Sequence, residues 1–267
     1  MASKEWQLTH EAAVRYEEIL VANILGPFAK ALVDWATIEE SSTVIDVGCG
    51  TGAAARFAAS KAGKVIGVDV NTEMLNVAQS LPEVDGAPIE WRRESAYDLS
   101  SADDSADVVL CAQTLQFLKE PVNALTEMRR VAKPGGAVYI SLWTDIEQSP
   151  YFAALVRAVA HHISEDTAAG LGSAFNLTEL DTILAHCASS GFEGPAASVA
   201  EITLLLPPLQ EFVPKHIRAT PMGIAYDAAE PATQQAIVDE LVDKLAAYET
   251  STGAAIPFRS HLVRAVK

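Results

Sequence analysis

Three glycines are the first feature of this sequence that could do chemistry. Gly48, Gly50 and Gly52 alternate with other residues inside the segment VIDVGCGTG, which begins at residue 44. Glycine allows positive φ and close approach of the backbone to a ligand. The alanine-rich stretch after the loop is typical of a helix, whose first N–H groups and positive dipole end would face the same ligand. A strand, a glycine loop and a helix in this order are typical of parallel sheets that bind an adenosine-bearing ligand.

Two aspartates near this loop indicate which ligand it would take. Asp46 precedes the first glycine by two residues, and a carboxylate there suits an ammonium and a sulfonium better than a pyrophosphate. The glycines are spaced G-x-G-x-G, whereas dinucleotide-binding loops use G-x-G-x-x-G. Asp69 ends the next expected strand, at about the ~20-residue separation at which a carboxylate receives ribose hydroxyls. The loop therefore favours an adenosine ligand with an amino-acid tail.

Alternating apolar strands and amphipathic helices surround the loop and must position it. The pattern predicts strands at 43–47, 64–70, 89–95, 106–112 and 137–143, separated by helices at 53–62, 71–81 and 121–132 and by the turn KPGG. Later strands are expected at 199–206 and 260–267, with helices at 151–163 and 177–192. This order predicts an α/β fold with a doubly wound, seven-stranded, Rossmann-like sheet, mostly parallel with an antiparallel last strand.

The chain is expected to form one domain over residues 1–267, because no repeat or low-complexity linker interrupts it. N-terminal helices are expected within 9–38, with a break at Gly26-Pro27. A helical insertion at about 207–253 would leave the sixth strand at its carboxyl end, beside the crevice where open α/β sheets bind ligands. It is expected to form a lid over the site, or else a packing or dimer helix pair. Candidates for the apolar wall of the lid are Phe212, Ile217 and Met222.

Charge balance and cysteine usage limit the partners. The chain has 35 acidic and 19 basic residues and a formal charge of −16, which disfavours nucleic acid and anionic membranes. Three scattered cysteines without a CxxC pair indicate reduced thiols and a cytoplasmic protein. No run approaches the ~18 apolar residues of a membrane span, and the N-terminus lacks the apolar core of a signal peptide. These features leave the oligomeric state open.

Five motifs occur in order along the chain: VIDVGCGTG, GVDVNTEML, SADDSADVVLCAQTLQFL, NALTEMRRVAKPGG and SSGF. Together they resemble the class I S-adenosylmethionine-dependent methyltransferases, and most of all the branch with small-molecule, quinone and lipid acceptors. The resemblance covers about residues 10–145. It implies S-adenosylmethionine as the cofactor and methyl transfer to a small organic acceptor by in-line displacement.

The resemblance also implies roles for the residues next to the first two strands. Gly48 and Gly50 would pass beneath the methionine moiety of the cofactor, and Asp46 would lie near its ammonium group. Asp69 would hold the ribose hydroxyls. Each role matches the chemistry inferred above from residue type and spacing.

The adenine end of the cofactor would be held by two segments. Val70 and Met74 would pack on the ring. The family's usual Gly-Asp-Ala motif has serine at its middle position here, so Ser95 replaces the aspartate that bonds to the adenine amino group. Ala96 would contribute its backbone N–H and Tyr97 its ring.

Four residues are expected near the acceptor. The resemblance places Gln113 where the cofactor meets the acceptor. Tyr16 and Trp143 are candidates for lining the acceptor pocket, with core packing as the alternative for each. Tyr16 is also expected to contact the cofactor. His216 lies in the expected lid and is the candidate general base.

Several features have a simpler interpretation. His161 and His162 are adjacent on a helix and point about 100° apart, so they are not expected to share a ligand, and no metal site is expected. Asp107 is expected to shape the loop before its strand. Ser95 and Ala106 depart from the family pattern and support the alternative of a non-catalytic regulatory protein that binds S-adenosylmethionine. An NAD-dependent oxidoreductase is opposed by the glycine spacing.

Overall fold

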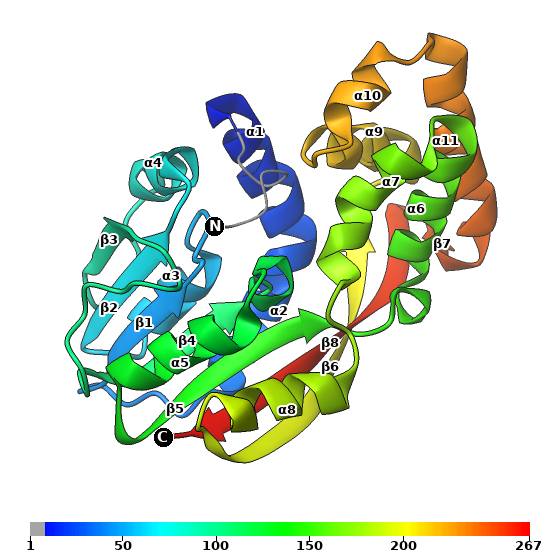
Figure 1. Ribbon diagram of the computed structural model, residues 1–267. Helices are drawn as coiled ribbons and strands as arrows, with labels where there is room; N and C mark the ends of the chain where they lie inside the picture. Colours follow the sequence, from blue (N-terminus) through cyan, green and yellow to red (C-terminus); the bar gives the residue numbers. More distant parts are fainter. Residues whose placement is uncertain (1–8) are drawn as a thin grey trace.

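The structure is a computed structural model that describes residues 9–267 (Figure 1). Its centre is an eight-stranded sheet of order β3-β2-β1-β4-β5-β8-β6, with β7 paired to β8 outside this path. The first five strands pair in parallel, and β8 runs antiparallel to both β5 and β6. The strands are β1 (Thr43–Val47), β2 (Lys64–Asp69), β3 (Ile89–Arg93), β4 (Ala106–Ala112), β5 (Ala132–Trp143), β6 (Glu193–Leu206), β7 (Glu249–Thr250) and β8 (Gly253–Val266).

This topology confirms the predicted fold class. Seven strands form the expected doubly wound sheet with an antiparallel last strand, and the two-residue β7 is an addition that the pattern did not indicate. Strand β5 begins at Ala132, so the residues KPGG belong to the strand and not to a separate turn. The pairing of β4 with β5 shifts in register between Ala106 and Val108, and this irregularity accommodates the four residues KPGG.

Helices cover both faces of the sheet. On one face, α5 (Pro121–Val131) and α8 (Leu180–Ser189) pack on residues such as Ile45 and Ile66. On the other, α2 (Gly26–Trp35) and α3 (Ala53–Ala59) pack on Val44 and Val65. Neighbouring strand residues thus enter opposite cores, which explains why these strands are apolar throughout. Helix α4 (Thr72–Ser80), whose N-terminus is capped by the Asn71 side chain, follows β2.

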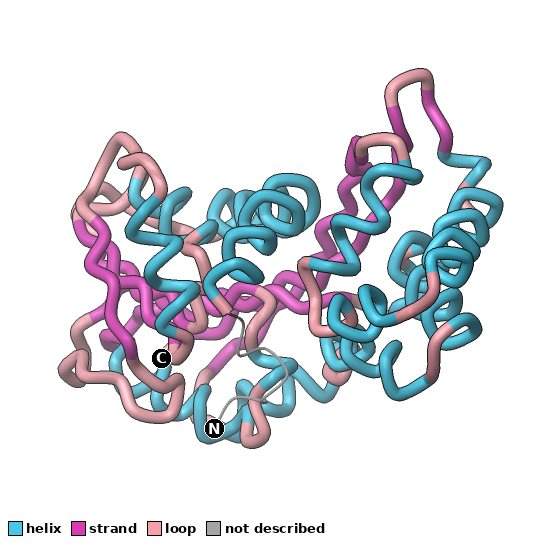
Figure 2. The backbone as a smooth tube through the Cα atoms, turned by 90° about the horizontal axis from the view of Figure 1, so that it is seen from above, coloured by secondary structure: helices cyan, strands magenta, loops and turns pink. Residues whose placement is uncertain are grey.

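A second group of helices, the helical lobe, lies at one end of the sheet (Figures 1 and 2). The long strands β6 and β8 run into it, and their residues Leu204 and Phe258 share its apolar core. Among the described residues, no helix is long and apolar enough to cross a membrane. The lobe consists of α6 (Pro150–His162), α7 (Glu165–Gly172), η5 (Ser173–Phe175), α9 (Leu209–Arg218), α10 (Gly223–Ala228) and α11 (Pro231–Lys244).

The N-terminal helices form one continuous helical segment. Helix α1 (His10–Arg15) passes into the π-helix η2 (Tyr16–Leu25), which passes directly into α2. The expected break at Gly26-Pro27 was wrong, because Gly26 keeps helical angles and its N–H donates to the carbonyl of Val21. That bond spans five residues, as in a π-helix. The wider turn gives room before Pro27, whose ring would clash with a carbonyl in a regular α-helix.

Candidate functional site

One cavity of about 150 Å³ lies where the carboxyl ends of the parallel strands meet η2 and the helical lobe. Almost all the residues predicted from sequence contribute to its lining, although they come from loops far apart in the chain. Asp46 lies instead in an adjoining smaller cavity, which shares Gly48 and Gly50 with the first. The predicted residues in the main cavity are Tyr16, Gly48, Gly50, Asp69, Val70, Met74, Ser95, Ala96, Tyr97, Gln113 and His216.

The glycines of the loop serve two different purposes. All three have positive φ, at 71° for Gly48, 56° for Gly50 and 91° for Gly52. A Cβ on Gly48 would lie 2.2 Å from Thr114 Cγ2, and one on Gly52 would lie 2.2 Å from the Trp91 ring. A Cβ on Gly50 would have no protein atom closer than 4.0 Å. Gly48 and Gly52 are therefore required by packing, while Gly50 keeps the backbone open towards the cavity.

Asp69 connects the glycine loop after β1 to the loop after β2. Its Oδ2 accepts a hydrogen bond of 2.9 Å from the Gly50 N–H, and its Oδ1 accepts one of 2.8 Å from the Asn71 N–H. Burial raises the pKa of this carboxyl, and the backbone donors oppose that rise. Each carboxylate oxygen has a second lone pair, so Asp69 can still accept from a diol in the cavity.

Asp46 carries an unused acceptor. The residue is fully buried; its Oδ2 accepts from the Ala55 N–H of α3 at 2.9 Å, and its Oδ1 has no hydrogen-bond partner among the described residues. Burial raises the pKa of Asp46 to about 7, and the nearby Asp69 adds to the rise. A buried carboxylate oxygen without a partner is costly, and a cationic ligand group would relieve that cost.

We expect Asp46 to make the ligand-free protein less stable as the pH rises. Between its ordinary pKa of 3.8 and about 7, the folded chain keeps a proton on Asp46 that the unfolded chain releases. The free energy of unfolding therefore falls through that window. Thermal denaturation of the wild type and Asp46→Asn at about pH 5 and about pH 8 checks this. The wild type should lose more stability than the variant, and equal losses would contradict the assignment.

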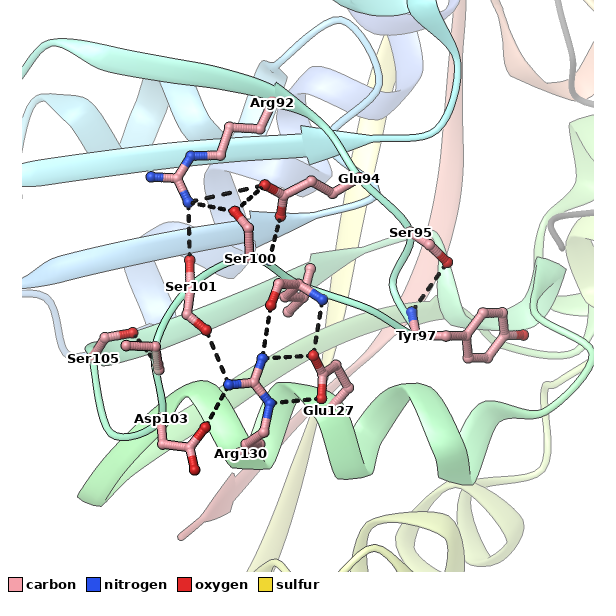
Figure 3. Close-up of polar contacts among 12 residues, drawn as sticks. Arg92, Glu94, Ser95, Tyr97, Ser100, Ser101, Asp103, Ser105, Glu127 and Arg130 are labelled. Carbon is pink, nitrogen blue, oxygen red and sulfur yellow. Dashed lines mark hydrogen bonds and ion pairs between the residues drawn. The ribbon is translucent and has the colours of Figure 1, made fainter.

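An arginine anchors the loop that carries Ser95, Ala96 and Tyr97, the residues predicted to hold the adenine (Figure 3). Arg130 of α5 donates to the carbonyls of Leu99 and Ser101, at 2.8 and 3.0 Å, and forms ion pairs with Glu127 and Asp103. Glu127 in turn accepts from the Leu99 N–H at 2.8 Å. This network holds the segment after β3 in place against α5.

Within that segment, Ser95 Oγ accepts from the Tyr97 N–H at 3.2 Å (Figure 3). The Tyr97 hydroxyl accepts from the Glu120 N–H at 3.3 Å. Ser95 and Tyr97 both line the cavity. Ser95 thus shapes its own loop and also lines the cavity.

Replacing Arg130 with leucine should lower the free energy of unfolding by about 2 kcal/mol, because hydrogen bonds from a charged donor contribute roughly 1.5–3 kcal/mol. Thermal denaturation measures the change. The matched control is Arg157→Leu, since Arg157 forms an exposed ion pair with Glu147 and such pairs contribute little. A loss no larger for Arg130→Leu than for the control would show that the network does not hold the loop.

Gln113 has a strained backbone and a fixed side chain. Its φ of 50° is one of two positive values among the described non-glycine residues, and strain of this kind often marks functional sites. Its Nε2 donates to Ser260 Oγ at 2.9 Å, and its Oε1 accepts from Gln116 Nε2 at 3.3 Å. Gln113 is thereby held between β8 and Gln116, at a position that lines both cavities.

The side of the cavity next to the helical lobe, here called its outer part, is lined mainly by residues 152–174. The sequence analysis predicted no site residue in this segment. Phe152, Leu171 and Ala174 of the lobe join Trp143 in lining it. Trp143 is also part of the lobe's apolar core, so its place in an acceptor pocket stays a prediction. From 207–253 only His216 contributes. The expectation that Phe212, Ile217 and Met222 wall the cavity was wrong. They are at most 1% exposed and belong to the apolar core between the lobe's own helices.

His216 is buried beside a tyrosine. Its Nδ1 lies 2.7 Å from the Tyr151 hydroxyl, the two rings stack at 5.2 Å, and its Nε2 has no hydrogen-bond partner among the described residues. Burial lowers the pKa of His216 to about 3. The imidazole is therefore neutral at physiological pH, and its Nε2 is buried.

Two other expectations concern residues outside the cavity. Asp107 accepts from the Thr43 N–H at 2.8 Å and pairs with Lys133, which agrees with a structural role. His161 and His162 do share a partner, contrary to expectation: Glu240 Oε2 lies 3.0 Å from Nδ1 of the first and 2.9 Å from Nε2 of the second. The two rings reach it because each uses a different nitrogen. The metal-free prediction stays a prediction.

Comparisons with known proteins show which proteins the chain is similar to. Residues 45–140 match the family described as methyltransferase domain. The ubiquinone biosynthesis O-methyltransferase of Hahella chejuensis is 30% identical to this chain over 118 residues, which are 44% of this chain and 50% of that protein. The chain thus spans about half the length of the curated relatives it matches.

Two solved structures share the fold at low sequence identity. The YcgJ protein of Bacillus subtilis is 16% identical, with a TM-score of 0.58 over 90% of this chain and 98% of that one. Phosphoethanolamine N-methyltransferase 2 of Haemonchus contortus, solved with S-adenosyl-L-methionine, is 20% identical, with a TM-score of 0.61 over 98% of this chain and 58% of that one. At these identities the likeness shows the fold.

Proposed function

We propose that this chain, whose residues 45–140 belong to the methyltransferase-domain family, is an S-adenosylmethionine-dependent methyltransferase that acts on a small organic acceptor. The observation that carries the proposal is the gathering of twelve residues, the eleven named above and Trp143, each assigned a role from sequence, around one cavity. They come from the carboxyl ends of the five parallel strands and the segments that follow these strands, from η2 and from α9. Ligands of open α/β sheets bind at this edge.

The residues present fit the methionine and ribose of the cofactor. The unpartnered Oδ1 of Asp46 offers a buried negative charge or acceptor to an ammonium group. Asp69 offers acceptors to the ribose hydroxyls, and the open face of Gly50 leaves room for the ligand beside the loop. When bound, S-adenosylmethionine supplies the methyl group and a good leaving group.

The residues at the other end of the cavity would hold the base and position the acceptor. Val70 and Met74 offer apolar surface to the adenine, with Ser95 and Tyr97 on the opposite loop. Gln113 would separate the cofactor from the acceptor. The lobe would exclude water and position the acceptor beside the cofactor, and positioning of this kind can contribute roughly 7–11 kcal/mol.

The acceptor is proposed to be a small apolar molecule. The relative in Hahella chejuensis is named as an O-methyltransferase, and the outer cavity is lined by aromatic and aliphatic side chains. No lysine or arginine is among the described residues that line it. A phosphorylated acceptor, such as the one in the name of the Haemonchus contortus enzyme, would lack a cationic partner here.

Transfer of labelled methyl groups tests the proposal. The protein is incubated with methyl-labelled S-adenosylmethionine and a small-molecule cell extract, and label in the organic phase is compared with label in protein and nucleic acid. We expect label in small molecules only. Tight cofactor binding without any transfer would favour the alternative of a non-catalytic regulatory protein, and label in macromolecules would contradict the proposed acceptor class.

A further inference from the structure

We propose that His161 and His162 of α6 and Glu240 of α11 form a binding site for a divalent metal ion such as Zn²⁺, which would join these two helices of the lobe. The proposal is separate from the proposed function, because none of the three side chains lines the cavity. It is carried by the convergence of three ligand atoms, from two helices, on one place.

The three ligand atoms lie close to the distances that a bound ion requires. Glu240 Oε2 lies 3.0 Å from His161 Nδ1 and 2.9 Å from His162 Nε2, and all three atoms lie within 4.8 Å of one another. An ion that binds nitrogen and oxygen at about 2.1 Å holds neighbouring ligand atoms roughly 3.0–3.4 Å apart. Small rotations of the side chains would therefore bring all three atoms to bonding distance. Among residues 9–267, no other group of three histidine, cysteine or acidic side chains converges in this way.

Adjacent histidines can share an ion here because they use different nitrogens. Helical neighbours point about 100° apart, and this spacing was the reason to expect no metal site from the sequence. In the structure both residues lie in the last turn of α6, with ring centroids 4.3 Å apart and ring planes at 34°. His161 meets Glu240 through Nδ1, and His162 meets it through Nε2. The geometric objection to a shared ligand is thereby removed.

The ligand set selects a class of metal ion. Imidazole nitrogens suit Zn²⁺, Ni²⁺ and Cu²⁺, whereas Mg²⁺ and Ca²⁺ take oxygen ligands. Two histidines and one glutamate form a known type of zinc site that keeps a fourth position for water. The site is open to solvent, since the side chain of His161 is 70% exposed and those of His162 and Glu240 are 23% and 25% exposed. An ion can therefore enter without any movement of the lobe.

A bound ion would join parts of the chain that are far apart in sequence. His162 and Glu240 are 78 positions apart, and a metal link that closes so long a loop is expected to stabilise the folded state. Helices α6 and α11 already pack together in the apolar core of the lobe. Because α6 also carries Phe152, which lines the cavity, the ion would steady one wall of the cavity from outside it.

Calorimetric titration of the metal-free chain, without an affinity tag, with ZnCl₂ tests the proposal. We expect one Zn²⁺ ion per chain and no heat from MgCl₂. Loss of a residue that only supports a metal ligand weakens metal binding about 10- to 100-fold, so Glu240→Gln and His162→Phe, which each remove a ligand, should weaken Zn²⁺ binding at least about tenfold. Thermal denaturation should show a Zn²⁺-dependent rise in melting temperature for the wild type that both variants lose.

His10→Phe is the matched control, because His10 Nδ1 lies 3.2 Å from Glu73 Oε2 in an exposed pair with one histidine. This variant should bind Zn²⁺ as the wild type does. With Co²⁺ in place of Zn²⁺, the absorption spectrum should show no thiolate charge-transfer band, which separates this site from the free cysteines. No uptake of Zn²⁺ by the wild type, unchanged affinity in Glu240→Gln and His162→Phe, or a thiolate band would overturn the proposal.

Discussion

Replacing Gly50 with valine is expected to abolish measurable binding of S-adenosylhomocysteine while the protein stays folded. The residue has φ of 56°, and a Cβ there would meet no protein atom within 4.0 Å. The fold thus bears only the cost of the backbone angle, roughly 1–2 kcal/mol. Binding of the ligand is lost because the branched side chain would occupy the open face of the loop. Calorimetric titration measures the binding, and circular dichroism confirms the fold.

Gly48 provides the matched control for this experiment. A Cβ at Gly48 would lie 2.2 Å from Thr114 Cγ2 in the protein itself. Gly48→Ala should therefore lower the melting temperature more than Gly50→Val, since its clash does not depend on a ligand. Retained binding in Gly50→Val would mean that the loop does not hold the cofactor.

Replacing Asp69 with alanine should weaken binding of S-adenosylhomocysteine by about 1.5–3 kcal/mol, or about 10- to 150-fold, the range for a hydrogen bond to a charged group. Asp69 is the last residue of β2, as the sequence predicted a strand to end near it. The structure shows both carboxylate oxygens bonded to the backbone of Gly50 and Asn71. Alanine would therefore also loosen the two loops.

Asp69→Asn separates these two effects. Asparagine keeps one acceptor oxygen and the shape of the side chain, so it should preserve the melting temperature better than alanine. It should still lose affinity, because the charge and one acceptor are gone. Unchanged affinity in both variants, measured by calorimetry, would remove Asp69 from the cofactor site.

The sheet and the cofactor side of the site could be predicted from local sequence. Strands β1 and β4 have the predicted bounds, because short apolar runs bordered by glycine or polar residues have few alternatives in a parallel sheet. The loops after such strands must meet at one edge. The residues after Val47 and Val68 therefore came together although no pattern in the sequence links them directly.

The outer part of the cavity could not be predicted in the same way. All four of Phe152, Leu171, Phe212 and Ile217 belong to the lobe's apolar core, but only Phe152 and Leu171 also line the cavity. On a helix, both kinds of residue repeat at the same spacing, since periodicity shows which face is buried and not what it is buried against. Whether an apolar residue of these helices also lines the cavity depends on how the helices of the lobe pack together.

The hydrogen bonds that orient the site residues could not be predicted from local sequence either. The Tyr151–His216 bond joins residues 65 positions apart, and the Gln113–Ser260 bond joins residues 147 positions apart. The π-helical turn before Pro27 has a related cause, because it depends on how one proline is accommodated in a long helix. Glycine followed by proline usually ends a helix, but here the wider π-helical turn lets the helix continue through Gly26 and Pro27.

Calorimetric titration of the wild-type protein with S-adenosylhomocysteine and, in parallel, with NAD tests the central claim most directly. The two ligands share adenosine and differ in the group attached to its ribose, a methionine-derived tail in one and a pyrophosphate in the other. The glycine spacing and the unpartnered oxygen of Asp46 predict that S-adenosylhomocysteine binds with one molecule per chain and that NAD gives no heat. Binding of NAD with no binding of S-adenosylhomocysteine would contradict the account.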